Sequence, residues 1–173
     1  MAKVCGKLIS TKFVLGKVTQ LKTRHLYKLI ENSVSWDSRI SLQNHTEAIQ
    51  ELFFFWKEQF KTFNYKNLFN YYIPELIVFS DASDTGLAAH LTNNEKLKIS
   101  FRNFTVNEKR NSSTWRELMA IEISLKALLN YLESKHVLWK TDNYAASCIV
   151  KRGSRKDVLQ VIAENIFKIR KPN

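Results

Sequence analysis

The spacing of apolar residues divides the chain into two parts of different character. In the first part, residues 3–31 carry apolar side chains at helical spacing, with a break near Gly16. Residues 45–60 carry a further apolar stripe at the same spacing. The pattern predicts a helical first part.

After Pro74 the periodicity becomes that of strands and helices in alternation. The apolar runs that predict strands lie at 76–80, 87–91 and 97–104. Residues 76–79 show no polar alternation, which suits a strand buried on both faces. A long amphipathic helix over about 113–133 follows, then a strand over 136–141 and two helices, over residues up to Gly153 and over 157–169. Three successive strands and a helical crossover to a fourth predict an α/β fold, with a mixed sheet and helices packed on it.

The boundary between the two parts is expected at Pro74. A stretch rich in Tyr, Phe and Asn, residues 63–72, precedes it. We therefore predict two domains, residues 1–74 and 75–173.

Three acids stand at the ends of predicted elements in the second part. Asp81 closes the first strand, Glu117 lies in the first turns of the long helix, and Asp142 closes the fourth strand. Each also has a structural explanation. Glu117 completes a capping box with Thr114, Asp142 or Asn143 can cap the next helix, and Asp81 can form an Asx-turn.

Taken together, the acids indicate a metal site. If the crossover places the fourth strand beside the first, Asp81 and Asp142 reach the same sheet edge and Glu117 lies over them. Three converging carboxylates repel one another unless a cation lies between them. Hard oxygen ligands suit Mg²⁺ or Mn²⁺, and clustered carboxylates hold paired ions at sites of phosphodiester cleavage.

The net charge of +11 and the pI near 9.7 favour a polyanionic partner, nucleic acid before a membrane. Lysines are interleaved through the first helices, where a solvated helix face is the alternative explanation. No apolar run approaches the length of a membrane span. The two cysteines, Cys5 and Cys148, lie far apart without a metal-binding motif, so an intracellular protein (cytoplasmic or nuclear) with reduced thiols is expected.

Three segments carry a resemblance to a known family: Ser-Asp-Ala-Ser-Asp-Thr-Gly at 80–86, Ser-Thr-Trp-Arg-Glu-Leu at 113–118 and Lys-Thr-Asp-Asn at 140–143. In order and spacing they resemble motifs of the RNase H domain of retroelement reverse transcriptases, of DIRS-type or related elements. This resemblance runs from Leu76 to the end of the chain. Residues 1–74, with Gly6-Lys7-Leu8, Thr23-Arg24 and Ser35-Trp36-Asp37, resemble the thumb and connection that precede RNase H in such polyproteins.

The resemblance implies an RNase H-like sheet, with strands 1–3 antiparallel and strand 4 parallel to strand 1. It implies metal-dependent hydrolysis of the RNA strand of RNA–DNA hybrids, with two Mg²⁺ or Mn²⁺ ions held by Asp81, Glu117 and Asp142. The polymerase part of the same polyprotein is the expected protein partner. Residues expected to contact nucleic acid are Asn143, Arg155, Lys22 and Arg24.

The family pattern continues with a fifth strand and a helix carrying a fourth acid, whereas the sequence ends at Asn173. A truncated domain with weakened cleavage is therefore expected. A non-catalytic nucleic-acid-binding module of the same fold is the main alternative. A helical protein-interaction domain is a third hypothesis, but it explains only the first half of the chain.

Overall fold

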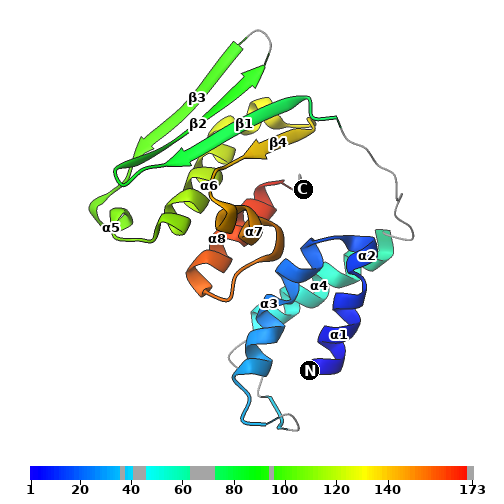
Figure 1. Cartoon of the computed structure of the whole chain (residues 1–173). Coiled ribbons are helices and arrows are strands. Elements are labelled where there is room, and N and C mark those ends of the chain that lie inside the picture. The colour runs from blue at the N-terminus through cyan, green and yellow to red at the C-terminus, as the bar shows by residue number, and fades with distance from the viewer. Residues whose placement is uncertain (36–37, 41–45, 63–72, 94–95, 171–173) are drawn as a thin grey trace. The chain divides into compact units, whose positions relative to one another are not determined.

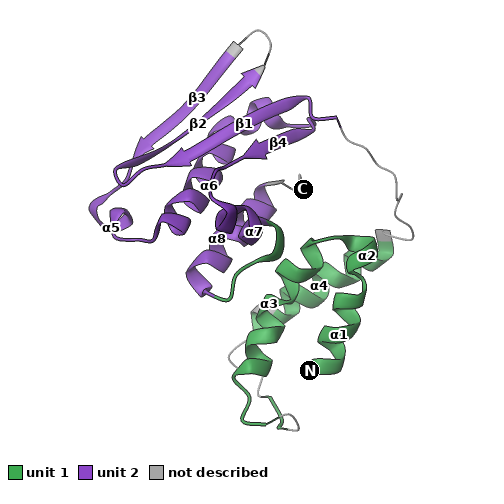
Figure 2. Cartoon of the chain, in the orientation of Figure 1, with its two compact units in different colours: residues 1–69, 151–155 green, residues 70–150, 156–173 purple. Residues whose placement is uncertain are grey.

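The computed structural model describes the chain except for residues 36–37, 41–45, 63–72, 94–95 and 171–173. The Tyr/Phe/Asn-rich stretch and the Trp36-Asp37 pair lie outside the described residues. The chain divides into two compact units, residues 1–69 with 151–155 and residues 70–150 with 156–173 (Figure 2). No helix among the described residues is long and apolar enough to cross a membrane.

The first unit is helical, as its apolar periodicity predicts. Its helices are α1 (Ala2–Ser10), α2 (Lys12–Leu15), α3 (Val18–Glu31) and α4 (Thr46–Thr62). The predicted break at Gly16 is present, because Gly16 ends α2 with a φ of 74°, a backbone conformation that favours glycine. The core of this unit gathers side chains from α1, α3 and α4: Cys5, Leu8, Leu26, Leu52 and Trp56.

The second unit is built on a four-stranded mixed sheet. Its strands are β1 (Leu76–Ala82), β2 (Gly86–Asn93), β3 (Lys96–Asn103) and β4 (Val137–Lys140), in the order β3-β2-β1-β4. β1 pairs antiparallel with β2, β2 antiparallel with β3, and β1 parallel with β4. The predicted sheet is therefore confirmed. The described part of the chain contains no fifth strand.

The helices that accompany this sheet are α5 (Val106–Lys109), α6 (Ser113–Leu132), α7 (Tyr144–Arg152) and α8 (Asp157–Arg170). α6 packs on one face of the sheet, and α8 packs against α6 (Figure 1). α6 carries the expected stripe, and Leu118, Ile121 and Leu125 pack into a core with Val78 of β1 and Ile166 of α8. Burying each such side chain contributes about 1.5–3 kcal/mol, so α6 is anchored firmly against β1.

Burial in β1 alternates, so the prediction of a strand buried on both faces is wrong. Leu76, Val78 and Ser80 face the helices, whereas Phe79 and Asp81 are exposed. Among the described residues of this unit, no helix covers that second face, which also exposes Ile99 and other apolar side chains of β3. The alternation matters for function because it turns Asp81 away from the hydrophobic core.

Candidate active site

Asp81, Glu117 and Asp142 meet at one edge of the sheet, although they come from three different elements. One carboxylate oxygen of each lies within 4.8 Å of the others. Asp81 and Asp142 are exposed, whereas Glu117 is buried. The predicted convergence is present, while the catalytic and metal-binding roles of the three residues stay predictions.

Parallel pairing of β1 and β4 brings the two aspartates together. Phe79 of β1 lies opposite Lys140 of β4, and each aspartate follows two residues further along its own chain direction. The indole Nε1 of Trp139 in β4 donates a hydrogen bond of 2.8 Å to Ser80 Oγ in β1. This bond ties the strands together on the helix side, directly beside the acids.

The start of α6 places Glu117. Ser112 is the N-cap, and its hydroxyl accepts the backbone N–H of Trp115. The predicted capping box with Thr114 as cap is therefore wrong, because α6 begins before Thr114 and Glu117 lies a full turn inside the helix. Its carboxylate is free to face the sheet.

Two donors hold the Glu117 carboxylate. Oε1 accepts the backbone N–H of Ala82 at 3.1 Å, and Oε2 accepts the Thr141 hydroxyl at 3.3 Å. The same Ala82 N–H also donates to Asp81 Oδ1 at 2.8 Å. One backbone amide therefore bridges two of the three acids.

The pKa of the Glu117 carboxyl lies above its ordinary value. Burial is the largest cause, and the charges of Asp142 and Asp81 raise the pKa further, while the bonds from Ala82 and Thr141 oppose the shift. A cation between the three carboxylates would relieve this repulsion. The donor set, three hard carboxylates and no soft ligand, fits Mg²⁺ or Mn²⁺.

A hollow of about 390 Å³ opens beside the acids on the exposed face of the sheet. Its lining residues are Phe79, Ser80, Asp81, Ala88, His90, Lys140, Thr141 and Asp142. The rings of Phe79 and His90 are stacked with centroids 5.0 Å apart, and Lys140 Nζ lies 5.1 Å from the Phe79 centroid. Lys140 thus lines the same hollow as the two exposed aspartates.

Residues 74–166 match the family described as the RNase H-like domain found in reverse transcriptase. The match covers more than half of the chain. This chain belongs to that family. No curated protein matches it.

Solved structures resemble this RNase H-like chain at low identity. The native protease-reverse transcriptase of prototype foamy virus is 14% identical, with a TM-score of 0.44, and the match covers 92% of this chain and 23% of that chain. A foamy viral protease-reverse transcriptase in complex with dsDNA is 15% identical, with a TM-score of 0.45 and coverages of 87% and 32%. One in complex with an RNA/DNA hybrid is 14% identical, with a TM-score of 0.43 and coverages of 87% and 20%. The chain spans about a third or less of the length of these proteins.

The residues predicted to contact nucleic acid lie in different surroundings. Asn143 caps α7 of the RNase H-like domain, and its Oδ1 accepts the Ala146 N–H at 2.8 Å. In the first unit, Lys22 is buried with Nζ 5.3 Å from the Phe55 ring centroid, and Arg24 Nε donates to the Arg152 carbonyl. Arg155 is exposed, with Nε 3.9 Å from a carboxylate oxygen of Glu31. None of these four is among the three acids or the residues that line the hollow.

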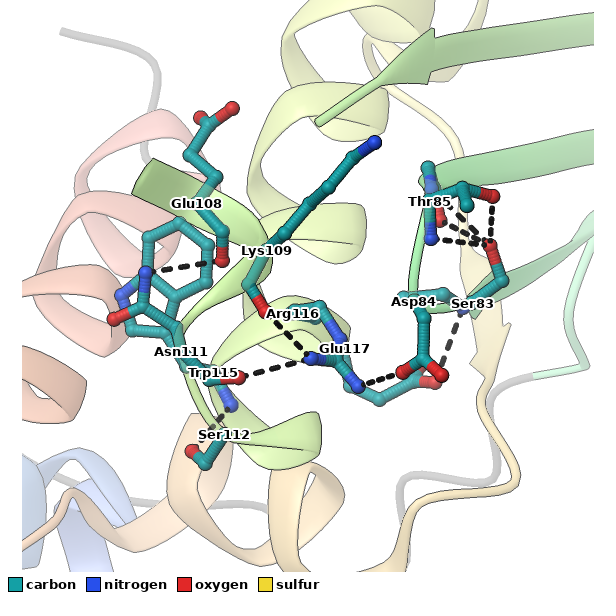
Figure 3. A network of polar contacts seen from close by, with 12 residues as sticks. Ser83, Asp84, Thr85, Glu108, Lys109, Asn111, Ser112, Trp115, Arg116 and Glu117 are labelled. Carbon is teal, nitrogen blue, oxygen red and sulfur yellow. Dashed lines mark hydrogen bonds and ion pairs between the residues drawn. The ribbon is translucent and has the colours of Figure 1, made fainter. Parts of the chain in front are cut away.

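Sequence reasoning missed several residues that support the acids. Thr141 donates to Glu117, and it stands directly before Asp142 in the sequence. Arg116 forms an ion pair with Asp84, a residue of the 80–86 motif to which the sequence analysis gives no role (Figure 3). In the sequence, the feature that could have drawn attention to Arg116 is its position directly before Glu117.

Proposed function

We propose that this RNase H-like domain hydrolyses the RNA strand of RNA–DNA hybrids in a metal-dependent reaction. The observation that carries the proposal is the convergence of three carboxylates within 4.8 Å in a member of the reverse-transcriptase RNase H family. The domain would act within a retroelement reverse transcriptase, of DIRS-type or related origin, beside the polymerase part of the same polyprotein and inside the cell.

Asp81, Glu117 and Asp142 would hold one or two Mg²⁺ or Mn²⁺ ions. Bound there, such ions lower the pKa of a coordinated water and stabilise negative charge on the leaving oxygen. Glu117 is fixed in orientation by Ala82 and Thr141, so its oxygens are already placed before substrate arrives. Asp81 and Asp142 are exposed and face the side from which a phosphodiester can approach.

Positive charge near the acids supports binding of a nucleic-acid backbone. Lys140 lies in the same hollow as Asp81 and Asp142, where its ammonium group can pair with a phosphate adjacent to the cleaved one. Preference for RNA would come from contacts to 2′-hydroxyl groups, the feature that distinguishes the two strands of a hybrid. Asn143, Lys22, Arg24 and Arg155 are further candidates for contacts to the nucleic acid.

A cleavage assay tests the proposal. An RNA–DNA hybrid labelled on the RNA strand is incubated with the chain in Mg²⁺, in Mn²⁺ and in EDTA, alongside double-stranded DNA and double-stranded RNA of the same sequence. We expect metal-dependent cleavage of the hybrid RNA only, and a loss of about 100-fold or more in Asp81→Asn, because that change removes a metal ligand. Glu133→Gln removes a carboxylate at the opposite end of α6 and serves as the matched control, with unchanged cleavage expected.

The outcomes separate the competing functions. Hybrid binding without cleavage in either metal would favour the non-catalytic nucleic-acid-binding module. Cleavage that persists in Asp81→Asn would contradict the assignment of the three acids.

A further inference from the structure

Arg116 joins the turn between β1 and β2 to the segment that precedes α6, and it stands directly before Glu117 in the sequence. Its Nη2 donates to Asp84 Oδ1 at 2.5 Å, and its Nη1 donates to the carbonyls of Asn111 at 2.9 Å and Lys109 at 3.2 Å. Figure 3 shows the guanidinium between the turn that carries Asp84 and the segment that precedes α6. The side chain of Arg116 is 13% exposed and that of Asp84 is 90% exposed.

The turn that carries Asp84 is internally fixed. Ser83 Oγ accepts the backbone N–H groups of Thr85 and Gly86, each at 3.1 Å, and Ser83 N–H donates to the Gly86 carbonyl at 2.9 Å. A Cβ on Gly86 would lie 2.8 Å from the Arg102 carbonyl oxygen, so β3 packs directly against the turn. These contacts tie residues 83–86 to one another, so we expect a displacement of Asp84 to displace Ser83 as well.

Ala82 links this turn to the acids. It precedes Ser83, and its N–H donates both to Asp81 Oδ1 and to Glu117 Oε1. The contact with Asp81 is made between adjacent residues, so the distance between the turn and the start of α6 bears on the contact with Glu117. Arg116 bears on that distance, because it stands in the first turns of α6, bonds to Asp84 of the turn, and also bonds to the Lys109 and Asn111 carbonyls of the segment that precedes α6.

A purely stabilising role explains this arrangement poorly. An ion pair whose acidic partner is almost fully exposed contributes little to global stability. Such a pair can still determine local geometry, because three hydrogen bonds converge on one planar guanidinium.

We propose that Arg116 is a positioning residue whose pairing with Asp84 holds the Ala82 amide between Asp81 and Glu117. The proposal rests on the proposed function, since its consequence is the geometry of the acid cluster. Loss of the pair would let the β1–β2 turn move away from α6, weaken the Ala82–Glu117 bond and change the separation of two metal ligands.

The test measures hydrogen exchange of the Ala82 amide by NMR in the metal-free protein. Asp84→Ala removes the ion pair at an exposed position and leaves no cavity. We expect the Ala82 amide to exchange about tenfold faster or more, because its hydrogen bond to Glu117 would open more often. Asp84→Glu retains the carboxylate and should restore most of the protection. Glu75→Ala breaks an exposed ion pair with Lys135 at the other end of β1 and should leave Ala82 unchanged.

Unchanged Ala82 exchange in Asp84→Ala would overturn the proposal, as would equal acceleration in Glu75→Ala. Mn²⁺ binding, followed by electron paramagnetic resonance, tests the proposed function separately. Absence of Mn²⁺ binding in the unsubstituted protein would contradict the metal site, while Ala82 exchange would still decide the role of Arg116. In a protein that cleaves, Asp84→Ala should lower kcat with an unchanged KM for the hybrid, and a change confined to KM would count against positioning.

Discussion

Glu117 shows how the candidate site works against the stability of the metal-free domain. Its carboxylate is buried close to two other acids, and burial together with those charges raises its pKa. Ala82 and Thr141 supply two hydrogen bonds, which offset part of this cost. A carboxylate held under such repulsion is expected where a cation binds.

Asp142→Asn should therefore stabilise the metal-free protein while impairing metal binding. The change removes one of the two charges that repel Glu117 without creating a cavity. We expect a gain of about 0.5–1 kcal/mol, which corresponds to a rise in Tm of about 1–4 °C for a chain of this size. The measurement is thermal unfolding in EDTA and in millimolar Mg²⁺.

In Mg²⁺ the unsubstituted protein should have the higher Tm of the two, because it gains stability from the bound ion and Asp142→Asn does not. Glu133→Gln controls for the change in net charge and should respond to Mg²⁺ as the unsubstituted protein does. A lower Tm of Asp142→Asn in EDTA would mean that Asp142 makes a stabilising contact that outweighs the repulsion.

For single residues, the sequence predicts which side chains belong to the candidate site better than it predicts the contacts they make. The three acids are recognisable because strand ends and a helix start carry them in motifs. Ala82 contributes through its backbone N–H, which no side-chain pattern reveals. The pairing of Arg116 with Asp84 depends on how the β1–β2 turn meets α6, so it becomes visible only with tertiary structure.

For helices and strands, a strong periodicity of apolar residues predicts their positions well. The helices α3, α4, α6 and α8 and all four strands lie close to their predicted ranges. α5 was missed because four residues cannot show a helical period. Its signal was local: Thr105 and Glu108 form a complete capping box, whereas the similar pattern at Thr114 does not cap α6.

The α5 capping box gives the domain an acid-sensitive element. The bond from the Arg102 side chain, followed by the backbone N–H of Thr105, lowers the pKa of Glu108 from the ordinary 4.5 to about 2. Because the pKa is lower in the folded state, this stabilisation is complete above about pH 4.5 and is lost as the pH falls towards 2.

Glu108→Gln should accordingly reduce stability at neutral pH by about 1–2 kcal/mol, through a lost charge-assisted bond and a weakened cap. The difference in unfolding free energy between the two proteins should shrink below pH 4.5 and disappear once the pH falls below about 2. Denaturant unfolding at several pH values measures this difference. Glu58→Gln is the control, because Glu58 forms an exposed ion pair with Lys61 within α4. A difference that stays constant down to pH 2 would contradict the role of the Glu108 charge.

The whole molecule combines a net charge of +11 with an acid cluster at one sheet edge. We expect the excess of Lys and Arg to attract a polyanion, and the acid cluster to repel phosphate until a cation binds. Binding and chemistry should therefore depend on different ions. Monovalent salt should weaken binding of the nucleic acid, and divalent metal should enable its cleavage.

Hybrid affinity in EDTA, where no cleavage is expected, should fall linearly on a plot of log affinity against log salt concentration. Each phosphate contact adds about 0.7–0.9 to the slope, because each releases condensed counterions. Lys140→Ala should lower the slope by about one contact, since Lys140 lies in the hollow beside Asp81 and Asp142. Lys135→Ala removes a lysine that lies just before β4 and pairs with Glu75, and the slope should be unaffected. Equal effects of the two variants would place the nucleic acid away from the hollow. A flat salt response would mean that the positive charge of this chain serves only to solvate its surface.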